Sequence, residues 1–216
     1  MVDYIVFDLD GTLLDTLEGL TLAVNEALKE LNVPYFYSKE EVKSFIGNGA
    51  YKLLARALKR KPTEEEFALF LKKYESCQYA SKAFPNVIST LKELESIGIK
   101  LIILSNKPNH ILQKLIANNL SEIDFSYVQG QDFNYPPKPD VTLLNVILKK
   151  LDLIDKKGLF VGDSIVDVLT ANNANLDSVI LTYGYGKKED LMSEKTIKLI
   201  DNFEEVKKYI WHIKKN

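Results

Sequence analysis

The sequence predicts an α/β protein whose core is a doubly wound parallel sheet, with a small α-helical unit inserted after the first strand. Two observations predict this architecture. Short runs rich in β-branched and aromatic residues alternate with helical patterns over most of the chain, as in parallel sheets that helices cover on both faces. Residues 16–82 instead show helical periodicity alone. We therefore expect an α/β core at residues 1–15 and 83–216 and a helical unit at residues 16–82.

The first strand is expected at residues 2–9, where a run of apolar residues ends in an acid. Four later runs have the same character and are expected as strands, at residues 99–104, 125–128, 158–161 and 178–181. Helical spacing of apolar residues separates most of these runs. The helix expected at residues 87–97 should stop at Gly98, because glycine readily takes the left-handed conformation that ends helices. The other core helices are expected at residues 110–118, 140–150, 165–174 and 203–213.

The inserted unit is expected to contain several helices joined by short breaks. The segments Asn32-Val33-Pro34 and Lys61-Pro62 interrupt the helical pattern. Because both connections to the core are short, we expect this unit to hinge over the sheet. Its helices are expected at residues 17–31, 39–46, 50–58 and 63–79.

The overall composition is that of an ordinary globular protein, with 46% hydrophobic and 27% charged residues among 216. A net charge of −2 gives no reason to expect a nucleic-acid partner. The single cysteine, Cys77, excludes an internal disulfide and is expected to be a small core residue. No apolar run is as long as a membrane span, and the first residues do not resemble a signal peptide, so we expect a cytoplasmic enzyme without a membrane partner.

Acidic residues stand at the expected carboxyl ends of two strands. Asp8 and Asp10 follow the first strand on one side of the backbone, and Gly11 allows a sharp turn there. Asp163 follows the fourth strand, and Asp167 lies one helical turn further on. In an open parallel sheet these strand ends border the crevice in which ligands bind. Two carboxylates about 4 Å apart repel by roughly 4 kcal/mol at an effective dielectric of about 20, so we expect a divalent cation among them.

The donor residues favour magnesium over zinc at this site. Carboxylates supply the all-oxygen ligand set that Mg²⁺ prefers, whereas the chain has only two histidines and one cysteine to offer zinc. Two further polar segments belong to the same crevice. Ser105 and Asn106 follow the second strand, and Lys138 stands at the start of the helix that leads to the fourth strand.

Each of these motifs, taken alone, has a purely structural interpretation. The Asp-x-Asp-Gly-Thr segment is compatible with a simple turn, and Lys138 with an ordinary surface lysine. Ser105-Asn106 and Gly162-Asp163-Ser164 are each compatible with a helix N-cap. The occurrence of all four in order, at successive strand ends, favours a single catalytic site.

Together these segments resemble the motifs of the haloacid dehalogenase-like hydrolase superfamily. Asp8-Leu9-Asp10-Gly11-Thr12 is similar to the first motif, Ser105 to the second, Lys138-Pro139 to the third, and Gly162-Asp163-Ser164 with Asp167 to the fourth. The resemblance spans essentially the whole chain. It implies a Rossmann-like core and a small α-helical cap at residues 16–82.

Within that superfamily, a segment of the cap resembles the phosphoglycolate phosphatase subgroup. It runs Phe45-Ile46-Gly47-Asn48-Gly49-Ala50 and continues at Leu53-Leu54-Ala55-Arg56-Ala57-Leu58. The chain departs from the family pattern at three positions outside the catalytic motifs. Asn86 and Asn175 stand where relatives commonly have glycine, and asparagine is the next-best residue for a left-handed backbone. Val141 replaces a proline that is common after the third motif.

The resemblance implies a role for each motif residue. Asp8 would be the nucleophile that forms an aspartyl-phosphate, and Asp10 would be the general acid and then the general base. Lys138 and Ser105 would hold the phosphoryl oxygens where charge develops. Because dehalogenases lack the second acid, the presence of Asp10 favours cleavage of a phosphate ester.

The resemblance also implies a metal site and a substrate site. Mg²⁺ would be bound by Asp8, the backbone carbonyl of Asp10 and Asp163, with Asp167 supporting this set. Tyr183-Gly184-Tyr185-Gly186, after the fifth strand, is expected at the entrance. The other residues expected to bind substrate are Gly11, Thr12 and Asn106 near the catalytic groups, and Lys52 and Arg56 in the cap.

We therefore expect a magnesium-dependent phosphatase that acts on a small phosphorylated metabolite. The cap resemblance favours 2-phosphoglycolate over pyrophosphate, nucleotides and sugar phosphates. Three alternatives remain open: a phosphohexose mutase, a phospho-acceptor module of the response-regulator type, and a binding protein that retains the fold without activity. The chain is expected as a monomer or a homodimer.

Overall fold

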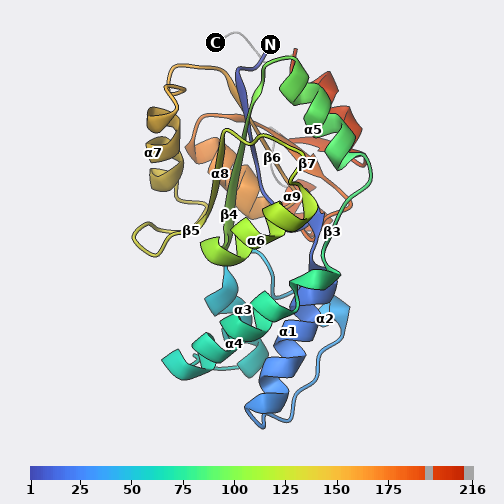
Figure 1. Ribbon diagram of the computed structural model, residues 1–216, viewed down its shortest axis with the longest axis vertical. Helices are drawn as coiled ribbons and strands as arrows, with labels where there is room; N and C mark the ends of the chain where they lie inside the picture. Colours follow the sequence, from blue (N-terminus) through green and yellow to red (C-terminus); the bar gives the residue numbers. More distant parts are fainter. Residues whose placement is uncertain (193–196, 212–216) are drawn as a thin grey trace.

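Six parallel strands form the central sheet of the protein (Figure 1). The computed structural model describes residues 1–192 and 197–211. The strand order is β5-β4-β1-β6-β7-β8, so the order reverses beside β1, which pairs with β4 on one side and β6 on the other. This arrangement confirms the doubly wound sheet. The strands are β1 (Tyr4–Phe7), β4 (Lys100–Pro108), β5 (Tyr127–Gln131), β6 (Gly158–Gly162), β7 (Asp177–Leu181) and β8 (Ile197–Ile200).

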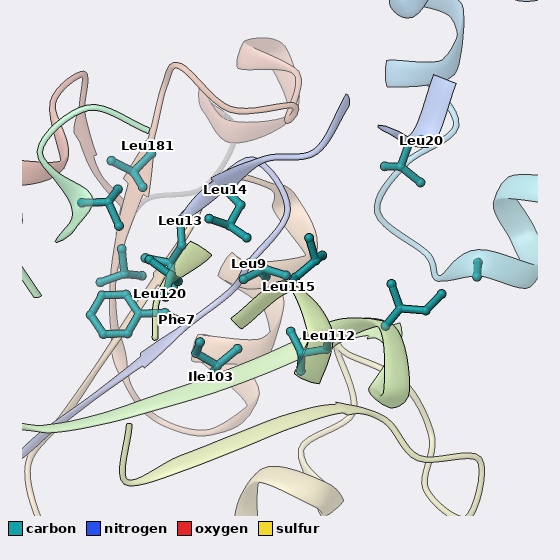
Figure 2. Close-up of a cluster of buried hydrophobic side chains, with 14 of the residues drawn as sticks. Phe7, Leu9, Leu13, Leu14, Leu20, Ile103, Leu112, Leu115, Leu120 and Leu181 are labelled. Carbon is teal, nitrogen blue, oxygen red and sulfur yellow. The ribbon is translucent and has the colours of Figure 1, made fainter. Parts of the chain in front are cut away.

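Alternation along β1 assigns its side chains to the two faces of the sheet. Ile5 and Phe7 belong to the larger hydrophobic cluster, whereas Tyr4 and Val6 belong to a second one. Figure 2 shows part of the larger cluster, in which Phe7 lies among leucines and Ile103. The larger cluster receives side chains from α5 (Val87–Ser96), α6 (Asn109–Asn119) and η2 (Phe203–Lys208). The second receives them from α7 (Thr142–Lys150) and α8 (Ile165–Asn173), and the short α9 (Lys188–Met192) packs against α8.

Four helices and a 3₁₀ turn form a separate layer, which lies below the sheet in Figure 1. We call this layer the cap. It consists of α1 (Leu17–Glu30), α2 (Lys39–Lys43), α3 (Ala50–Leu58), α4 (Glu64–Ser76) and η1 (Gln78–Ala80). The two segments that join the cap to the sheet pair with each other, because β2 (Leu14–Asp15) runs antiparallel to β3 (Lys82–Ala83). Both connections therefore leave the core side by side.

Local sequence signals account for several element ends. Thr63 and Glu66 form a reciprocal capping box at the start of α4, and Asn86 precedes α5 with a left-handed backbone (φ 63°). Asn175, after α8, is also left-handed (φ 54°). Both asparagines thus have the left-handed backbone that was expected at these positions. Cys77 ends α4 as a buried residue, as expected.

The structure differs from the prediction in several places. β4 continues to Pro108, and α2 ends at Lys43 instead of residue 46. The strands β2, β3 and β8 and the helix α9 were not predicted. In place of the helix expected at 203–213 there is a 3₁₀ helix, η2, and residues 212 and 213 lie outside the described ranges. Among the described residues, no helix has the length and apolar character that a membrane span requires.

Candidate active site

A cavity of about 240 Å³ lies between the carboxyl ends of the strands and the cap. The strand order explains its place, because ligand crevices in open parallel sheets form where that order reverses. Core residues that line it include Asp8, Asp10, Ser105, Lys107, Lys138, Asp163 and Asp167. Cap residues that line it include Lys43, Gly47, Asn48, Gly49, Arg56 and Tyr74.

Asp8 is the first residue after β1, and its side chain is 14% exposed. Its Oδ1 atom forms an ion pair with Nζ of Lys138, at 3.0 Å. Burial raises the pKa of Asp8 to about 6, although the nearby Lys138 ammonium opposes the shift. The carboxylate thus pairs one oxygen with the lysine while the side chain stays partly exposed at the cavity.

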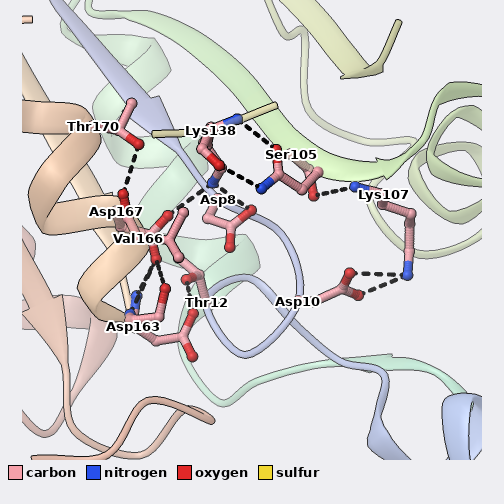
Figure 3. A network of polar contacts seen from close by, with 12 residues as sticks. Asp8, Asp10, Thr12, Ser105, Lys107, Lys138, Asp163, Val166, Asp167 and Thr170 are labelled. Atoms are coloured by element: carbon pink, nitrogen blue, oxygen red, sulfur yellow. Dashed lines mark hydrogen bonds and ion pairs between the residues drawn. The ribbon is translucent and has the colours of Figure 1, made fainter. Parts of the chain in front are cut away.

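Lys138 is almost fully buried between two carboxylates (Figure 3). Its Nζ lies 2.7 Å from Oδ1 of Asp167 and 3.0 Å from Oδ1 of Asp8. Burial opposes its charge, but the two carboxylates outweigh this effect and raise the pKa of Lys138. The lysine is therefore a permanent cation in the wall of the cavity.

Asp163 and Asp167 are held by donors from three loops. Thr12 Oγ1 donates to Asp163 Oδ1 at 2.8 Å, and the Tyr185 amide donates to Asp163 Oδ2 at 2.7 Å. Asp167 Oδ2 accepts from the hydroxyl group of Ser164 at 2.8 Å and from two backbone amides. Burial, reinforced by the charge of Asp167, raises the pKa of Asp163 well above its ordinary value.

These acids fit a hard divalent cation. Among the described residues, Asp8, Asp163 and Asp167 each offer a carboxylate oxygen within 4.8 Å of the others. Glycine at positions 11 and 184 leaves room for the Asp163 side chain, because a Cβ atom at either position would overlap it. The carboxylate of Asp10 is not part of this cluster, so any contribution of Asp10 to the metal must come from its backbone.

Asp10 lies on the cap side of the cavity, beside a lysine that the sequence analysis did not single out. Thr16 Oγ1 donates to Asp10 Oδ1 at 2.5 Å, and Nζ of Lys107 lies 2.8 Å from the same oxygen. Figure 3 shows this ion pair apart from the Asp8 cluster. A signal for Lys107 was present, because the period of two along β4 places Ser105 and Lys107 on one side of the strand.

Asn106 and Ser105 hold other parts of the site in place. Asn106 Oδ1 accepts from the Lys138 amide at 2.8 Å, and its Nδ2 donates to the Lys138 carbonyl at 3.0 Å. Asn106 therefore anchors the backbone of the buried lysine. Ser105 Oγ accepts from the Lys107 amide at 3.2 Å. The N-cap interpretation of Ser105-Asn106 is wrong because α6 begins only at Asn109, whereas Ser164 does cap α8.

The structure separates the two cap cations that were predicted to bind substrate. Arg56 lines the cavity, and its guanidinium donates to the Phe45 carbonyl and to Asn48 Oδ1, both at 2.5 Å. It thus braces the glycine-containing segment before α3. Lys52 is exposed and does not reach the cavity, because α3 turns it away from the buried side that carries Leu53.

The loop after β7 contributes to both the cavity and the connection to the cap. Tyr185 and Gly186 line the cavity, as predicted for the entrance. The Tyr185 hydroxyl group accepts from the amides of Thr16 at 2.7 Å and Leu17 at 3.0 Å, and it donates to Asp15 Oδ1 at 2.8 Å. Lys43 of α2, which the sequence analysis did not single out, also lines the cavity. Its Nζ lies 5.9 Å from the centre of the Tyr185 ring.

Comparison with known proteins gives consistent matches over most of the chain. The model of the haloacid dehalogenase-like hydrolases matches residues 5–181. Phosphoglycolate phosphatase 1 of Pseudomonas aeruginosa is 33% identical over 211 residues, which cover 94% of this chain and 77% of that protein. Phosphoglycolate phosphatase of Vibrio cholerae is 36% identical over 201 residues, which cover 88% of each. The crystal structure of a predicted phosphoglycolate phosphatase from Haemophilus somnus 129PT has a TM-score of 0.85 at 32% identity and covers 97% of this chain and 98% of that one.

Proposed function

Because the chain belongs to the haloacid dehalogenase-like hydrolases and is a phosphoric monoester hydrolase, we propose that it is a Mg²⁺-dependent phosphatase that acts through an aspartyl-phosphate. The observation that supports this proposal most directly is the position of Asp8. It lies at the reversal of the strand order, paired with a buried lysine and within a cluster of three acids.

In the first step, the carboxylate of Asp8 attacks phosphorus in line and forms the aspartyl-phosphate while the ester oxygen departs. Bound Mg²⁺ supplies positive charge that lets an anionic nucleophile approach an anionic phosphoryl group. Asp8 and Asp163 would hold the cation together with the carbonyl of Asp10, and Asp167 would support this set. Lys138 is placed to neutralise charge that develops on the phosphoryl oxygens.

Asp10 acts as the general acid and base in this proposal. It donates a proton to the departing alkoxide and then accepts a proton from the water that hydrolyses the aspartyl-phosphate. Its hydrogen bond from Thr16 and its ion pair with Lys107 fix the carboxyl group beside the cavity. The separation of Asp10 from the three-acid cluster suits a group that meets the leaving group instead of the metal.

The substrate that we favour is 2-phosphoglycolate. The curated relatives described above are phosphoglycolate phosphatases, and the matches to them include the cap as well as the core. The cavity is small, and the charged residues that line it from the cap, Lys43 and Arg56, are both cations, whereas the core side carries acids as well as lysines. Such walls suit a leaving group that bears a negative charge.

A panel of phosphorylated metabolites, ranked by kcat/KM from phosphate release, tests this assignment. The panel should contain 2-phosphoglycolate, pyrophosphate, nucleoside monophosphates and sugar phosphates. We expect 2-phosphoglycolate to rank first. A higher kcat/KM for a sugar phosphate would reassign the substrate, and formation of an isomeric sugar phosphate without phosphate release would indicate a mutase.

A further inference from the structure

Thr16 precedes the first cap helix, α1, but its hydroxyl group does not cap that helix. A threonine at this N-cap position ordinarily accepts a hydrogen bond from an amide of the first helical turn, and its backbone is ordinarily extended. The side chain of Thr16 caps no amide of α1, and its backbone (φ −110°, ψ 2°) is not extended. Thr16 Oγ1 instead donates to Asp10 Oδ1 at 2.5 Å.

Tyr185, on the loop after β7, supplies the acceptor that the Thr16 side chain does not. Its hydroxyl oxygen accepts from the amides of Thr16 at 2.7 Å and Leu17 at 3.0 Å. The Leu17 amide also donates to Asp15 Oδ1, at 3.2 Å. The first amides of a helix have no partner within it, so an acceptor from outside stabilises them. Because Tyr185 satisfies these amides, the Thr16 hydroxyl group is free to hold Asp10.

The backbone of Tyr185 is fixed to the core and not to the cap. Its amide donates to Asp163 Oδ2 at 2.7 Å. A Cβ atom at Gly184 would lie 2.3 Å from Asp163 Cβ, and one at Gly186 would lie 2.1 Å from the Asp163 carbonyl oxygen. The loop therefore lies directly against the end of β6 on both sides of Tyr185. From there, the Tyr185 side chain holds the start of α1 in place relative to the sheet.

Two groups hold the carboxyl group of Asp10. Lys107, at the end of β4, has its Nζ 2.8 Å from Oδ1 and 3.0 Å from Oδ2. Thr16 holds Oδ1 from the first connection between core and cap, and it is fully buried, so water does not compete for this hydrogen bond. Of the two groups, Thr16 is the one that directly adjoins a cap helix.

We propose that Tyr185 is a positioning residue, which keeps Asp10 aligned for proton transfer by holding the backbone of Thr16. This inference rests on the proposed function, because it takes Asp10 as the general acid and base. Without the Tyr185 hydroxyl group, the first amides of α1 lose an acceptor, and the Thr16 hydroxyl group turns to them as in an ordinary N-cap. Asp10 then keeps only its ion pair with Lys107.

Tyr185→Phe tests the proposal, because it removes the hydroxyl group and keeps the ring. Since Lys107 still holds Asp10, we expect kcat for 2-phosphoglycolate to fall about 10- to 100-fold, only part of the roughly 100- to 10,000-fold that general acid–base catalysis supplies. KM should change by less than about 3-fold, because the lost interaction acts in the transition state. The measurement is steady-state phosphate release with Mg²⁺ present. A higher KM with unchanged kcat would overturn the proposal.

Tyr37→Phe is the matched control for the loss of a buried tyrosine hydroxyl group. Tyr37 is 7% exposed, and its hydroxyl group donates to the Ala57 carbonyl at 2.8 Å within the cap, away from the residues that line the cavity. We expect this variant to lower the free energy of unfolding and to leave kcat unchanged. A loss of kcat as large as that in Tyr185→Phe would attribute both effects to stability and overturn the proposal.

Substitution of Thr16 tests the same chain of contacts without changing Tyr185. Thr16→Val removes the hydroxyl group and keeps the amide, so kcat should fall as in Tyr185→Phe, whereas Thr16→Ser should retain most of it. Because both residues act through Asp10, adding Tyr185→Phe to Thr16→Val should lower kcat by less than about 3-fold more. Losses that multiply in the double variant, or an unchanged kcat in Thr16→Val, would overturn the proposal.

The same assays separate this inference from the proposed function. If wild-type protein hydrolyses phosphate esters and Tyr185→Phe keeps the wild-type kcat, the inference about Tyr185 fails and the phosphatase stands. If wild-type protein hydrolyses no ester at all, both fail.

Discussion

Asp8 carries the reaction in the proposed mechanism while lying largely buried beside other acids. Burial raises its pKa to about 6, and the Lys138 ammonium opposes this shift. Burial also raises the pKa of Asp163, with a further contribution from Asp167. These carboxyl groups favour the charged form fully only when additional positive charge is present. We therefore expect the charge of the nucleophile to depend on a bound cation.

Replacement of the nucleophile tests this role directly. Asp8→Asn should lower kcat for 2-phosphoglycolate by more than about 1,000-fold, because the amide cannot form the acyl phosphate. The measurement is steady-state phosphate release, with circular dichroism to verify the fold. Asp124→Asn, which changes an exposed aspartate that does not line the cavity, is the control and should retain activity. Comparable activity in the two variants would rule out Asp8 as the nucleophile.

Some residues of the site could be placed from the amino-acid sequence, and others could not. Asp8 and Asp163 were placed correctly in one cavity, because each directly follows a strand of the parallel sheet. Asn106 was expected to bind substrate; it lines the cavity, and it also anchors the backbone of Lys138, which was not expected. That contact joins segments 32 residues apart, so only the packed fold determines it. Lys107 was missed because β4 extends four residues beyond the predicted strand.

At the level of elements, one hydroxyl group makes three of the contacts at the first connection between core and cap. Tyr185 Oη bonds to Asp15, Thr16 and Leu17 at the junction of β2 and α1. The same residue uses its backbone amide to hold Asp163. A single loop after β7 thus links the cluster of three acids to the first connection between core and cap.

Removing that hydroxyl group should destabilise the protein measurably. Tyr185→Phe leaves the Thr16 amide without its acceptor and the Leu17 amide with Asp15 Oδ1 alone, so we expect the free energy of unfolding to fall by about 1–3 kcal/mol. Tyr79→Phe removes a hydroxyl group from a side chain that is 80% exposed, and it should change the free energy of unfolding by less than about 0.5 kcal/mol. Urea unfolding measures both values. Equal stability of the two variants would show that the Tyr185 contacts do not stabilise the junction.

The capping box of α4 should give the stability of the protein a specific pH dependence. Its hydrogen bonds with Arg60, and then with Thr63, lower the pKa of Glu66 to about 2 from an ordinary value of 4.5. Because the folded-state pKa is the lower one, this stabilisation is present above about pH 4.5 and is lost as pH falls towards 2. Glu66→Gln should therefore lower Tm clearly at pH 7 and much less near pH 2.5.

Thermal unfolding at the two pH values measures this effect. Glu64→Gln is the control, because it removes a charge from the same turn of α4. A Tm difference between wild type and Glu66→Gln that is the same at both pH values would contradict the assigned origin of the stabilisation.

Most helices and the main strands followed from apolar periodicity, whereas the short elements did not. β2 and β3 contain two residues each, which is too short for a pattern of alternation. They form because the two ends of the cap segment meet. β8 contains only four residues and depends on pairing with β7 at the edge of the sheet. Such elements are determined by tertiary contacts instead of local propensity.

For the molecule as a whole, we expect bound Mg²⁺ to be needed for activity and also to increase stability. Mg²⁺ bound to the folded state alone raises the free energy of unfolding, by about 2.7 kcal/mol at a concentration 100 times its Kd. We therefore expect Mg²⁺ to raise Tm and EDTA to abolish activity reversibly. Asp163→Asn should lose the Mg²⁺-dependent rise in Tm, whereas Asp124→Asn should retain it. Full activity in excess EDTA would contradict the metal requirement.

The pairing of β2 with β3 has a consequence for how this protein can diversify. Leu14 lies opposite Ala83, so the chain enters and leaves the cap at neighbouring points. The segment between these points can therefore change in length without changing the distance between its two ends. The cap is thus a replaceable module: a chimaera that keeps Thr16 and carries the cap of a relative from there to residue 82 should keep the chemistry of the sheet and acquire a new choice of leaving group.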